Sequence, residues 1–447
     1  MTILSVQARK ARELKIQALE LLEWAVEDMS PAGGPELHIK AGFEREGHFI
    51  KPVHEQPAPS FDWHIKNEIE MEEHAKRLAQ LVGKDTRLRN IYYDNAGTYK
   101  LEVVTHPLGL VRATRAIDEI CDTAMHRARK DGFSQANFGP VPATIVDEFE
   151  SKAGGLFKSG EFAPSQFQDY YGEVFNVPGQ GKTLFGCGQH CNLSLWKGNE
   201  NLFVRDRNDP AAANNQLVNH IAEKSLKWLP YTFLLCRKGN YYRIAANSDF
   251  GVHHFSAKDA VSENEPKSFK TGHILRYTAD HSARLIMHVW NPKTFRLEFR
   301  QAVAEADPYD VALASVTPMV KTCDEIFQKD LNGKIVLDKH KHPILTHPSD
   351  FPSELQYNER VPHNEEEAKV AFDPENNPYF SYLDELAERR IQKAVAENYG
   401  GFTETLALGE VYSLRGIGSR LLASYCSEYN IPVPEKTERI ISARPRW

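Results

Sequence analysis

Two short strand-like segments that lie far apart in the sequence most constrain how this chain can fold. The first, Gly186–Trp196, places His190 on the same strand face as the polar residues two and four positions later, because side chains alternate between the two faces of a strand. The second, Arg296–Arg300, places Glu298 between two arginines of one face in the same way. A histidine and a carboxylate beside amide, hydroxyl and guanidinium groups predict a metal site that handles phosphate.

The composition restricts the class of protein. The 447 residues are 41% hydrophobic and 26% charged, which is enough to bury a large core in one or two domains. The net charge of -7 and a pI near 6.2 provide no basic field, so nucleic acid is not expected as the main partner. The mean hydropathy is -0.50 and no apolar run approaches the roughly 18 to 20 residues that cross a bilayer. The sequence therefore predicts no membrane segment.

The N-terminal segment and the cysteines indicate a cytoplasmic location. Residues 1–30 mix basic and acidic side chains, which is not typical of a signal or transit peptide and favours an amphipathic helix. Six cysteines scattered over the chain favour reduced thiols. Cys187 and Cys191 form a single pair that lacks the second pair of a zinc site.

Hydrophobic periodicity and turn residues predict an α+β fold, with an antiparallel sheet that has helices on one side. Helices are predicted at 7–28, 67–82, 109–130 and 211–228, and the chain is mainly helical downstream of 310. Strands are predicted at 37–47 and on both sides of a turn at Gly97 within 89–105. Residues 133–183 are rich in Gly, Pro, Ser and Phe, and we expect loops there.

Potential metal ligands occur on four of the predicted strands. They are Glu44, Glu46, Asp94, Glu102, His190 and Glu298. A single pair of acids two residues apart is more typical of a solvated strand face, but an ordered set of carboxylates with one imidazole suits two or three hard cations such as Mg²⁺ or Mn²⁺. The set therefore predicts a centre that holds these ions and leaves positions for the phosphates of a nucleotide.

The segments that carry these residues resemble the glutamine synthetase superfamily. Gly186–Trp196 is similar to the family's Gly-x-Gly-x-His-x-His-x-Ser-Leu-Trp, and Arg296–Arg300 with Asp307–Tyr309 is similar to Arg-x-Glu-x-Arg followed by Asn-Pro-Tyr. Gly42–Glu46 resembles the family's Gly-x-Glu-x-Glu and equally the glutamate-cysteine ligase version, which has a basic residue between the acids. Asn240–Arg243 and Asp249 resemble the Asn-Ser-Tyr-x-Arg segment and the flap acid that follows it. The matches keep the family order from about residue 36 to 320.

The resemblance implies a glutamine synthetase-like catalytic domain with a curved antiparallel sheet and flanking helices at residues 36–330. It would follow an N-terminal helix at 1–35 and precede a mainly helical extension at 331–447, packed on the catalytic domain. Only a short stretch precedes the first acidic strand, which leaves no room for the family's N-terminal β-grasp domain. A homo-oligomer is compatible with this organisation, but the family's dodecamer is not assumed.

The resemblance also implies a role for each site residue. One metal would be held by Glu46, Asp94 and Glu102, and the other by Glu44, His190 and Glu298. Arg243 and Arg300 would bind a substrate carboxylate, with Gly186 and Gly188 also at the substrate. Lys293 and Arg296 would face the phosphates of ATP, with Asn192 and Ser194 on the nucleotide side. Asp249 would accept the proton of the incoming amine.

Two positions depart from the family pattern. Phe185 replaces the asparagine that contacts the amino group of glutamate, and Asn192 replaces the second histidine. The resemblance therefore implies an ATP-dependent carboxylate-amine ligase that uses Mg²⁺ or Mn²⁺ and acts on a small glutamate-like acid and on ammonia, an amine or an amino acid. The alternatives are a phosphotransferase of the related guanidino-kinase type and a non-catalytic nucleotide-binding relative.

Overall fold

The computed structural model describes most of the chain. The described residues are 6–50, 61–95, 100–133, 135–138, 173–177, 181–185, 188–203, 216–228, 231–232, 235–236, 271–275, 285–288, 296–304, 306–347, 356–357, 365–373, 377–398, 413–428 and 431–442. Within these ranges, no helix has both the length and the apolar character needed to cross a membrane. Five cysteines in the described part of the chain are buried free thiols: Cys121, Cys191, Cys236, Cys323 and Cys426.

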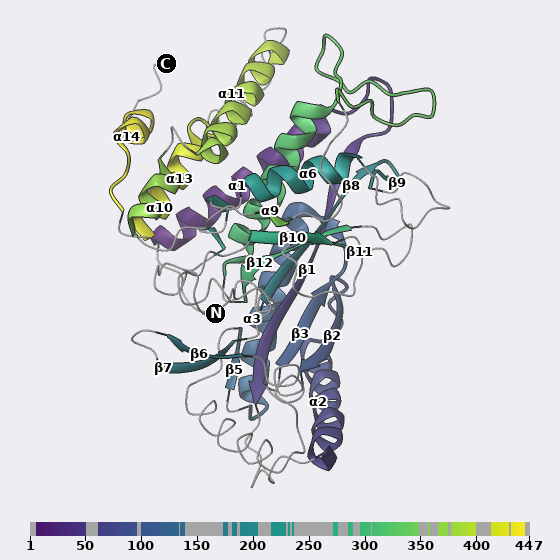
Figure 1. Ribbon diagram of the computed structural model, residues 1–447, viewed down its shortest axis with the longest axis vertical. Helices are drawn as coiled ribbons and strands as arrows, with labels where there is room; N and C mark the ends of the chain where they lie inside the picture. The colour runs from purple at the N-terminus through teal and green to yellow at the C-terminus, as the bar shows by residue number, and fades with distance from the viewer. Residues whose placement is uncertain are drawn as a thin grey trace.

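A large curved sheet forms the centre of the molecule (Figure 1). Its main path runs β13-β10-β11-β12-β8-β1-β3-β2. The strands of this path are β1 (Leu37–Ile50), β2 (Leu88–Asn95), β3 (Lys100–Thr105), β8 (Gly188–Lys197), β10 (Thr271–Leu275), β11 (Leu285–His288), β12 (Arg296–Val303) and β13 (Gln356–Tyr357). Short strands β4 (Leu108–Gly109) and β5 (Gln135–Asn137) pair with β1, and β9 (Glu200–Asn201) pairs with β8. The central order β12-β8-β1-β3 brings together strands from distant parts of the sequence.

Helices cover one face of the central strands. The buried side chains of β8 on that face, Cys191, Leu193 and Leu195, belong to one apolar core with α9 (Pro308–Ile326). The core also includes α1 (Val6–Asp28) and α3 (Leu110–Lys130), both of which contact β1, while α2 (Phe61–Val82) packs on β2. Almost every residue of α9 is buried, as expected of a helix that is apolar on all sides.

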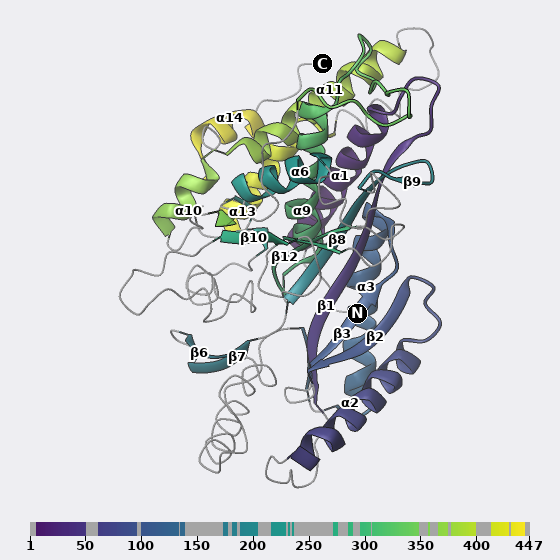
Figure 2. The ribbon, with the colours of Figure 1, turned by 45° about the vertical axis from the view of Figure 1, so that its right-hand side comes forward.

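The C-terminal helices extend the helical layer. Helices α11 (Pro378–Asn398) and α13 (Ile417–Glu428) pack on α1, and α11 also contacts α9. Figure 2 shows these helices on the side of the molecule away from α2. The remaining helices are α6 (Gln216–Lys227), α10 (Glu365–Phe372) and α14 (Glu435–Ser442).

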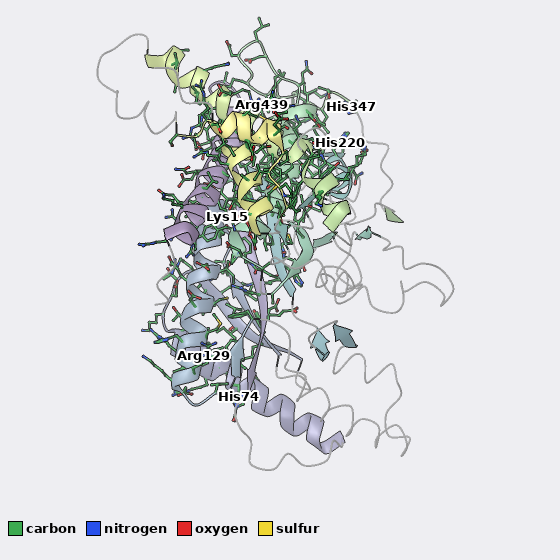
Figure 3. All side chains as sticks on the ribbon, turned by 90° about the vertical axis from the view of Figure 1, so that its left-hand side faces the viewer. Lys15, His74, Arg129, His220, His347 and Arg439 are labelled. Atoms are coloured by element: carbon green, nitrogen blue, oxygen red, sulfur yellow. The ribbon has the colours of Figure 1, made fainter. Side chains whose placement is uncertain are left out.

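A buried ionic cluster fixes the start of α9 to α1. Asp307 caps the helix by accepting a hydrogen bond from the Tyr309 amide at 3.0 Å, and Pro308 follows at the first helical position. The Lys15 ammonium donates to Asp307 at 2.8 Å and to Asp310 at 2.7 Å, and the Tyr425 hydroxyl also donates to Asp310. Figure 3 shows Lys15 on α1 next to the C-terminal helices. The cluster therefore joins three helices that are distant in sequence.

The structure confirms the predicted α+β class, and it shows two local differences. Strands β10 and β11 pair in parallel, whereas the prediction was an antiparallel sheet. Strands β6 (Glu173–Val177) and β7 (Gly181–Phe185) form a separate antiparallel hairpin, most of which lies within residues 133–183, where we expected loops. Valine and aromatic residues within this Gly-rich stretch favour extended backbone, and composition averaged over fifty residues conceals them.

Candidate metal and nucleotide site

Strand β1 supplies two acids to the face of the sheet opposite the helices. Glu44 and Glu46 lie on this face, while the intervening Arg45 and the fully buried Phe43 point toward the core. Burial of Phe43 fixes the register, since a slip of one residue would place an acid in the apolar core. The apolar core thus holds both carboxylates at the site.

The neighbouring strands bring the other ligands to the same place. Across the β1–β8 pair Glu44 lies opposite His190, and across the β1–β3 pair Glu46 lies opposite Glu102. On the other side of β8, Asn192 lies opposite Glu298 of β12. Antiparallel pairing alone therefore gathers these side chains onto one face of four adjacent strands.

These side chains form two ligand groups that share one imidazole. Glu44, His190 and Glu298 form the first group, and Glu46, Glu102 and His190 form the second. Within each group, one ligand atom per residue lies within 4.8 Å of the others. Nδ1 of His190 is 3.2 Å from Glu298 Oε1 and 3.6 Å from Glu44 Oε2. The first group has the same three residues as one predicted metal site, whereas the second group adds His190 to Glu46 and Glu102 of the other predicted site. The division into two metal sites remains a prediction.

Hydrogen bonds hold the two acids of β1 in place. Oε1 of Glu44 accepts from Arg296 Nη2 at 3.1 Å and from Asn192 Nδ2 at 3.1 Å. Oε2 of Glu46 accepts from the backbone amide of Gly188 at 2.6 Å. Each carboxylate therefore has an oriented oxygen, as metal ligands require.

The electrostatic environment keeps Glu44 ionised. Burial and the charge of Glu298 would raise the pKa of Glu44, but a hydrogen bond from His190 and the positive charges of Arg296 and His190 outweigh them. The pKa of Glu44 consequently lies below its ordinary value. An ionised carboxylate is the form that binds a cation.

The residues at this site fit hard divalent cations. Carboxylate oxygens with one imidazole are the donors that Mg²⁺ and Mn²⁺ accept, and Glu46, His190 and Glu298 are each less than 5% exposed. Oδ1 of Asn192 is buried and has no hydrogen-bond partner among the described residues, so an acceptor remains available at the edge of the cluster. Several buried acids this close together repel one another, and bound cations would remove that cost.

A cavity of about 100 Å³ opens next to the first ligand group. Glu44, Asn192, Ser194 and Arg296 line it together with residues that the sequence did not single out, including Lys40, Arg89, Thr105 and Trp196. The Lys40 ammonium lies 3.7 Å from the centre of the Trp196 ring, and Trp196 Nε1 donates to Ser194 Oγ at 2.8 Å. The cavity thus combines an aromatic ring with cationic and polar groups beside the acids.

Several predicted site residues lie outside the described residues. Gly186, Arg243, Asp249 and Lys293 are among them. Arg300 and Asp94 lie in β12 and β2, but their side chains are outside the described part. Phe185 ends β7, and its side chain is likewise outside. These assignments remain predictions.

The sequence analysis missed Lys40, Trp196 and Arg45. Lys40 lies four residues before Glu44, so strand alternation places it on the same face, and this signal was available in the sequence. Trp196 is two residues beyond Ser194 and follows the same rule. The resemblance includes a basic residue between the two acids, but nothing in the sequence indicates that Arg45 bonds backbone carbonyls far along the chain.

The amino-acid sequence matches no family model and no curated protein. Among solved structures, the chain is similar to one described as a novel glutamine synthase homolog. The two are 15% identical, the alignment covers 95% of this chain and 72% of the other, and the TM-score is 0.47. It is also similar to an ADP complex of GmaS (14% identity, 96% and 76% covered, TM-score 0.43) and to Plasmodium falciparum glutamine synthetase (12% identity, 93% and 75% covered, TM-score 0.47). A glutamine synthetase and a homolog of the enzyme are therefore among the solved structures that this chain resembles.

Proposed function

We propose that this protein is an ATP-dependent carboxylate-amine ligase that uses two divalent cations. The observation that carries the proposal is the pair of ligand groups that share His190 on one face of the sheet, beside a cavity lined by Arg296 and Trp196. The reaction activates a glutamate-like acid as an acyl-phosphate, and nitrogen then displaces phosphate to form an amide. A free carboxylate needs this activation because its oxygen is a poor leaving group.

Mg²⁺ or Mn²⁺ would be held by the two ligand groups, with Asp94 joining the second group. When bound, these cations neutralise charge on the phosphates during transfer. Asn192 and Gly188 orient the carboxylates of Glu44 and Glu46, so the ligands are set before a cation arrives. Preset ligands lose little conformational entropy on binding.

The cavity provides the nucleotide side of the site. Arg296 lies at its boundary with the acids, where a guanidinium can exchange Glu44 for a phosphate oxygen. Ser194 and Asn192 supply polar contacts, and Trp196 supplies a ring face for a base. The Lys40 ammonium lies over this ring, and the imidazole of His38 stacks with it at a centroid distance of 6.5 Å, so a base that binds here displaces one of these side chains.

The acid and amine sites rest on the family resemblance. We assign the substrate carboxylate to Arg243 and Arg300, with Gly186 and Gly188 nearby, and we assign Asp249 as the base that deprotonates the amine. Lys293 would add a second cation at the phosphates. The substrates are small molecules, ATP is consumed to ADP and phosphate, and a reducing cytoplasm suits the buried free thiols.

Phosphate release and mass-spectrometric product detection test the proposal. The purified protein is incubated with ATP and Mg²⁺ or Mn²⁺ against a grid of glutamate-like acids and amines. The ligase requires both an acid and an amine for phosphate release and yields a product with their summed mass less water. ADP formed without free phosphate would instead identify a phosphotransferase, and the absence of turnover with ATP bound would indicate the non-catalytic alternative.

Two variants control this experiment. Glu298→Ala removes a ligand of the first group and is expected to abolish phosphate release. Glu435→Gln changes an exposed acid of α14, and its activity is expected to equal that of the wild type. Equal activity of Glu298→Ala and the wild type would contradict the two-metal site.

A further inference from the structure

Arg45 lies between the two acids of β1, but its side chain points to the opposite face of the sheet. It is 9% exposed, and its guanidinium lies 4.9 Å from the centre of the Phe138 ring. Burying a guanidinium is costly unless its donors are satisfied. The partners that satisfy it therefore indicate what the residue does.

Besides the Cys121 thiol of α3, those partners are two backbone carbonyls just beyond β12. Arg45 Nε donates to the carbonyl of Ala304 at 2.6 Å, and Nη2 donates to that of Ala306 at 3.4 Å. Strand β8 lies between β1 and β12, so the side chain reaches beneath one strand to hold the next. A single residue thus connects the strand that carries Glu44 to the end of the strand that carries Glu298.

The connection occurs where strand pairing alone is weakest. Residues Leu297–Phe299 of β12 pair regularly with β8, and the register then shifts before Ala302. A bulge of this kind interrupts the ladder and bends the strand. Ala302 and Val303 then pair with β8 again, and Arg45 holds the chain just beyond them, immediately before Asp307 caps α9. A side chain of β1 therefore holds the chain at the point where β12 ends.

We propose that Arg45 is a positioning residue that sets the distance between the acids of β1 and Glu298 through its two carbonyl bonds. This inference rests on the proposed function, because it assigns Arg45 a role in the geometry of the same metal site. The planar guanidinium suits the task, because it donates in two fixed directions. Arg45 does not contact the metal face of the sheet.

Titration with Mn²⁺, followed by the electron paramagnetic resonance signal of the free ion, tests this role well below the melting temperature. Arg45→Met keeps the length of the side chain and removes both donors. Arg45→Lys keeps the charge but cannot bond both carbonyls. Gln189→Met is the matched control: Gln189 is fully buried opposite Arg45 on β8, and its amide atoms have no hydrogen-bond partner among the described residues.

We expect Arg45→Met to bind Mn²⁺ about tenfold to a hundredfold more weakly than the wild type, as is typical when a group that orients metal ligands is lost. The Mn²⁺ affinity of Arg45→Lys should lie between those of Arg45→Met and the wild type, and it should be at least about threefold weaker than that of the wild type. Gln189→Met should bind as the wild type does. A purely structural role would lower the melting temperature of the metal-free protein but leave the Mn²⁺ affinity of the folded protein unchanged.

If Arg45→Met or Arg45→Lys bound Mn²⁺ as tightly as the wild type, the inference would be overturned. An equal loss of Mn²⁺ affinity in Gln189→Met would overturn it too, because the loss would then reflect a disturbed core. If Arg45→Met does not fold, the Arg45→Lys variant decides: a Mn²⁺ affinity at least about threefold weaker than that of the wild type supports the inference, and a smaller loss overturns it. Failure of the wild type to bind Mn²⁺ would reject the proposed function itself. That result appears before any variant is measured, so the two failures are distinguishable.

Discussion

Replacing Glu298 with glutamine separates the metal response of the protein from its intrinsic stability. The substitution keeps the shape of the side chain and removes a charge that is 3% exposed. Glu298 belongs to the first ligand group, with its Oε1 3.2 Å from Nδ1 of His190. The change therefore acts on one ligand of that group and leaves the strand pairing intact.

Opposing charges make the effect on the metal-free protein small. A carboxylate within 4.8 Å, such as Glu44, repels Glu298 by about 3 to 4 kcal/mol at an effective dielectric constant of about 20. If the imidazole of His190 carries a proton, its attraction to Glu298 at 3.2 Å is about 5 kcal/mol at the same dielectric constant. Removing both interactions leaves a net loss of stability of about 1 to 2 kcal/mol at most, so the melting temperature without metal should fall by only a few degrees.

The response to Mn²⁺ should change much more. At a concentration of about 100 Kd, a bound ligand stabilises the folded wild type by about 2.7 kcal/mol. If the affinity for Mn²⁺ falls about tenfold, the stabilisation by Mn²⁺ at the same concentration is about 1.4 kcal/mol, and if it falls about a hundredfold, it is about 0.4 kcal/mol. Thermal melts with and without Mn²⁺ measure the difference, with Glu435→Gln as the control. An equal Mn²⁺-induced shift in Glu298→Gln and the wild type would refute the assignment of Glu298 as a ligand.

Further substitutions test other parts of the structure. His190→Ala should remove the Mn²⁺-induced shift at both ligand groups, and a retained shift measured by the same melts would exclude a shared imidazole. Trp196→Ala should weaken ATP binding in calorimetry by about 1 to 3 kcal/mol while Mn²⁺ affinity stays constant, and a loss of both would remove its role as a base platform. Lys15→Met should lower the free energy of unfolding, measured by urea denaturation, by about 3 to 5 kcal/mol at pH 8 and by less at pH 5. Burial raises the pKa of Asp310 from 3.8 to about 7 even with Lys15 beside it, and the loss of Lys15 raises this pKa further. A carboxyl whose pKa is higher in the folded than in the unfolded state loses its stabilising contribution as the pH rises, so the variant is less stable relative to the wild type at pH 8 than at pH 5. Equal deficits at both pH values would contradict this account.

The sequence predicted the parts of the site that follow from local periodicity. Alternation along a strand placed Glu44 with Glu46, and the position of His190 within an apolar strand placed it on the polar face. These rules need only the neighbouring residues. Antiparallel pairing preserves each strand's faces, so the predicted ligands with described side chains lie on one face, although His190 is close to both groups of acids rather than to one.

The parts that depend on contacts between distant segments were not predicted. The bonds of Arg45 to Ala304 and Ala306 join backbone atoms to a side chain more than 250 positions earlier, and carbonyls carry no sequence signal. The parallel pair of β10 and β11 was likewise missed, since strand periodicity does not report strand direction. The Lys15 cluster has the same origin, because its carboxylates lie far along the chain.

The order of the ligands along the chain has a consequence for biosynthesis. The first group needs Glu44 from an early strand and Glu298 from a late one, with His190 paired between them. A ribosome must therefore complete about two thirds of the polypeptide before this group exists, and pairings of such high sequence separation are slow to form. A cation cannot template the early stages of folding at this group, so its uptake would mark a chain whose central sheet is already assembled.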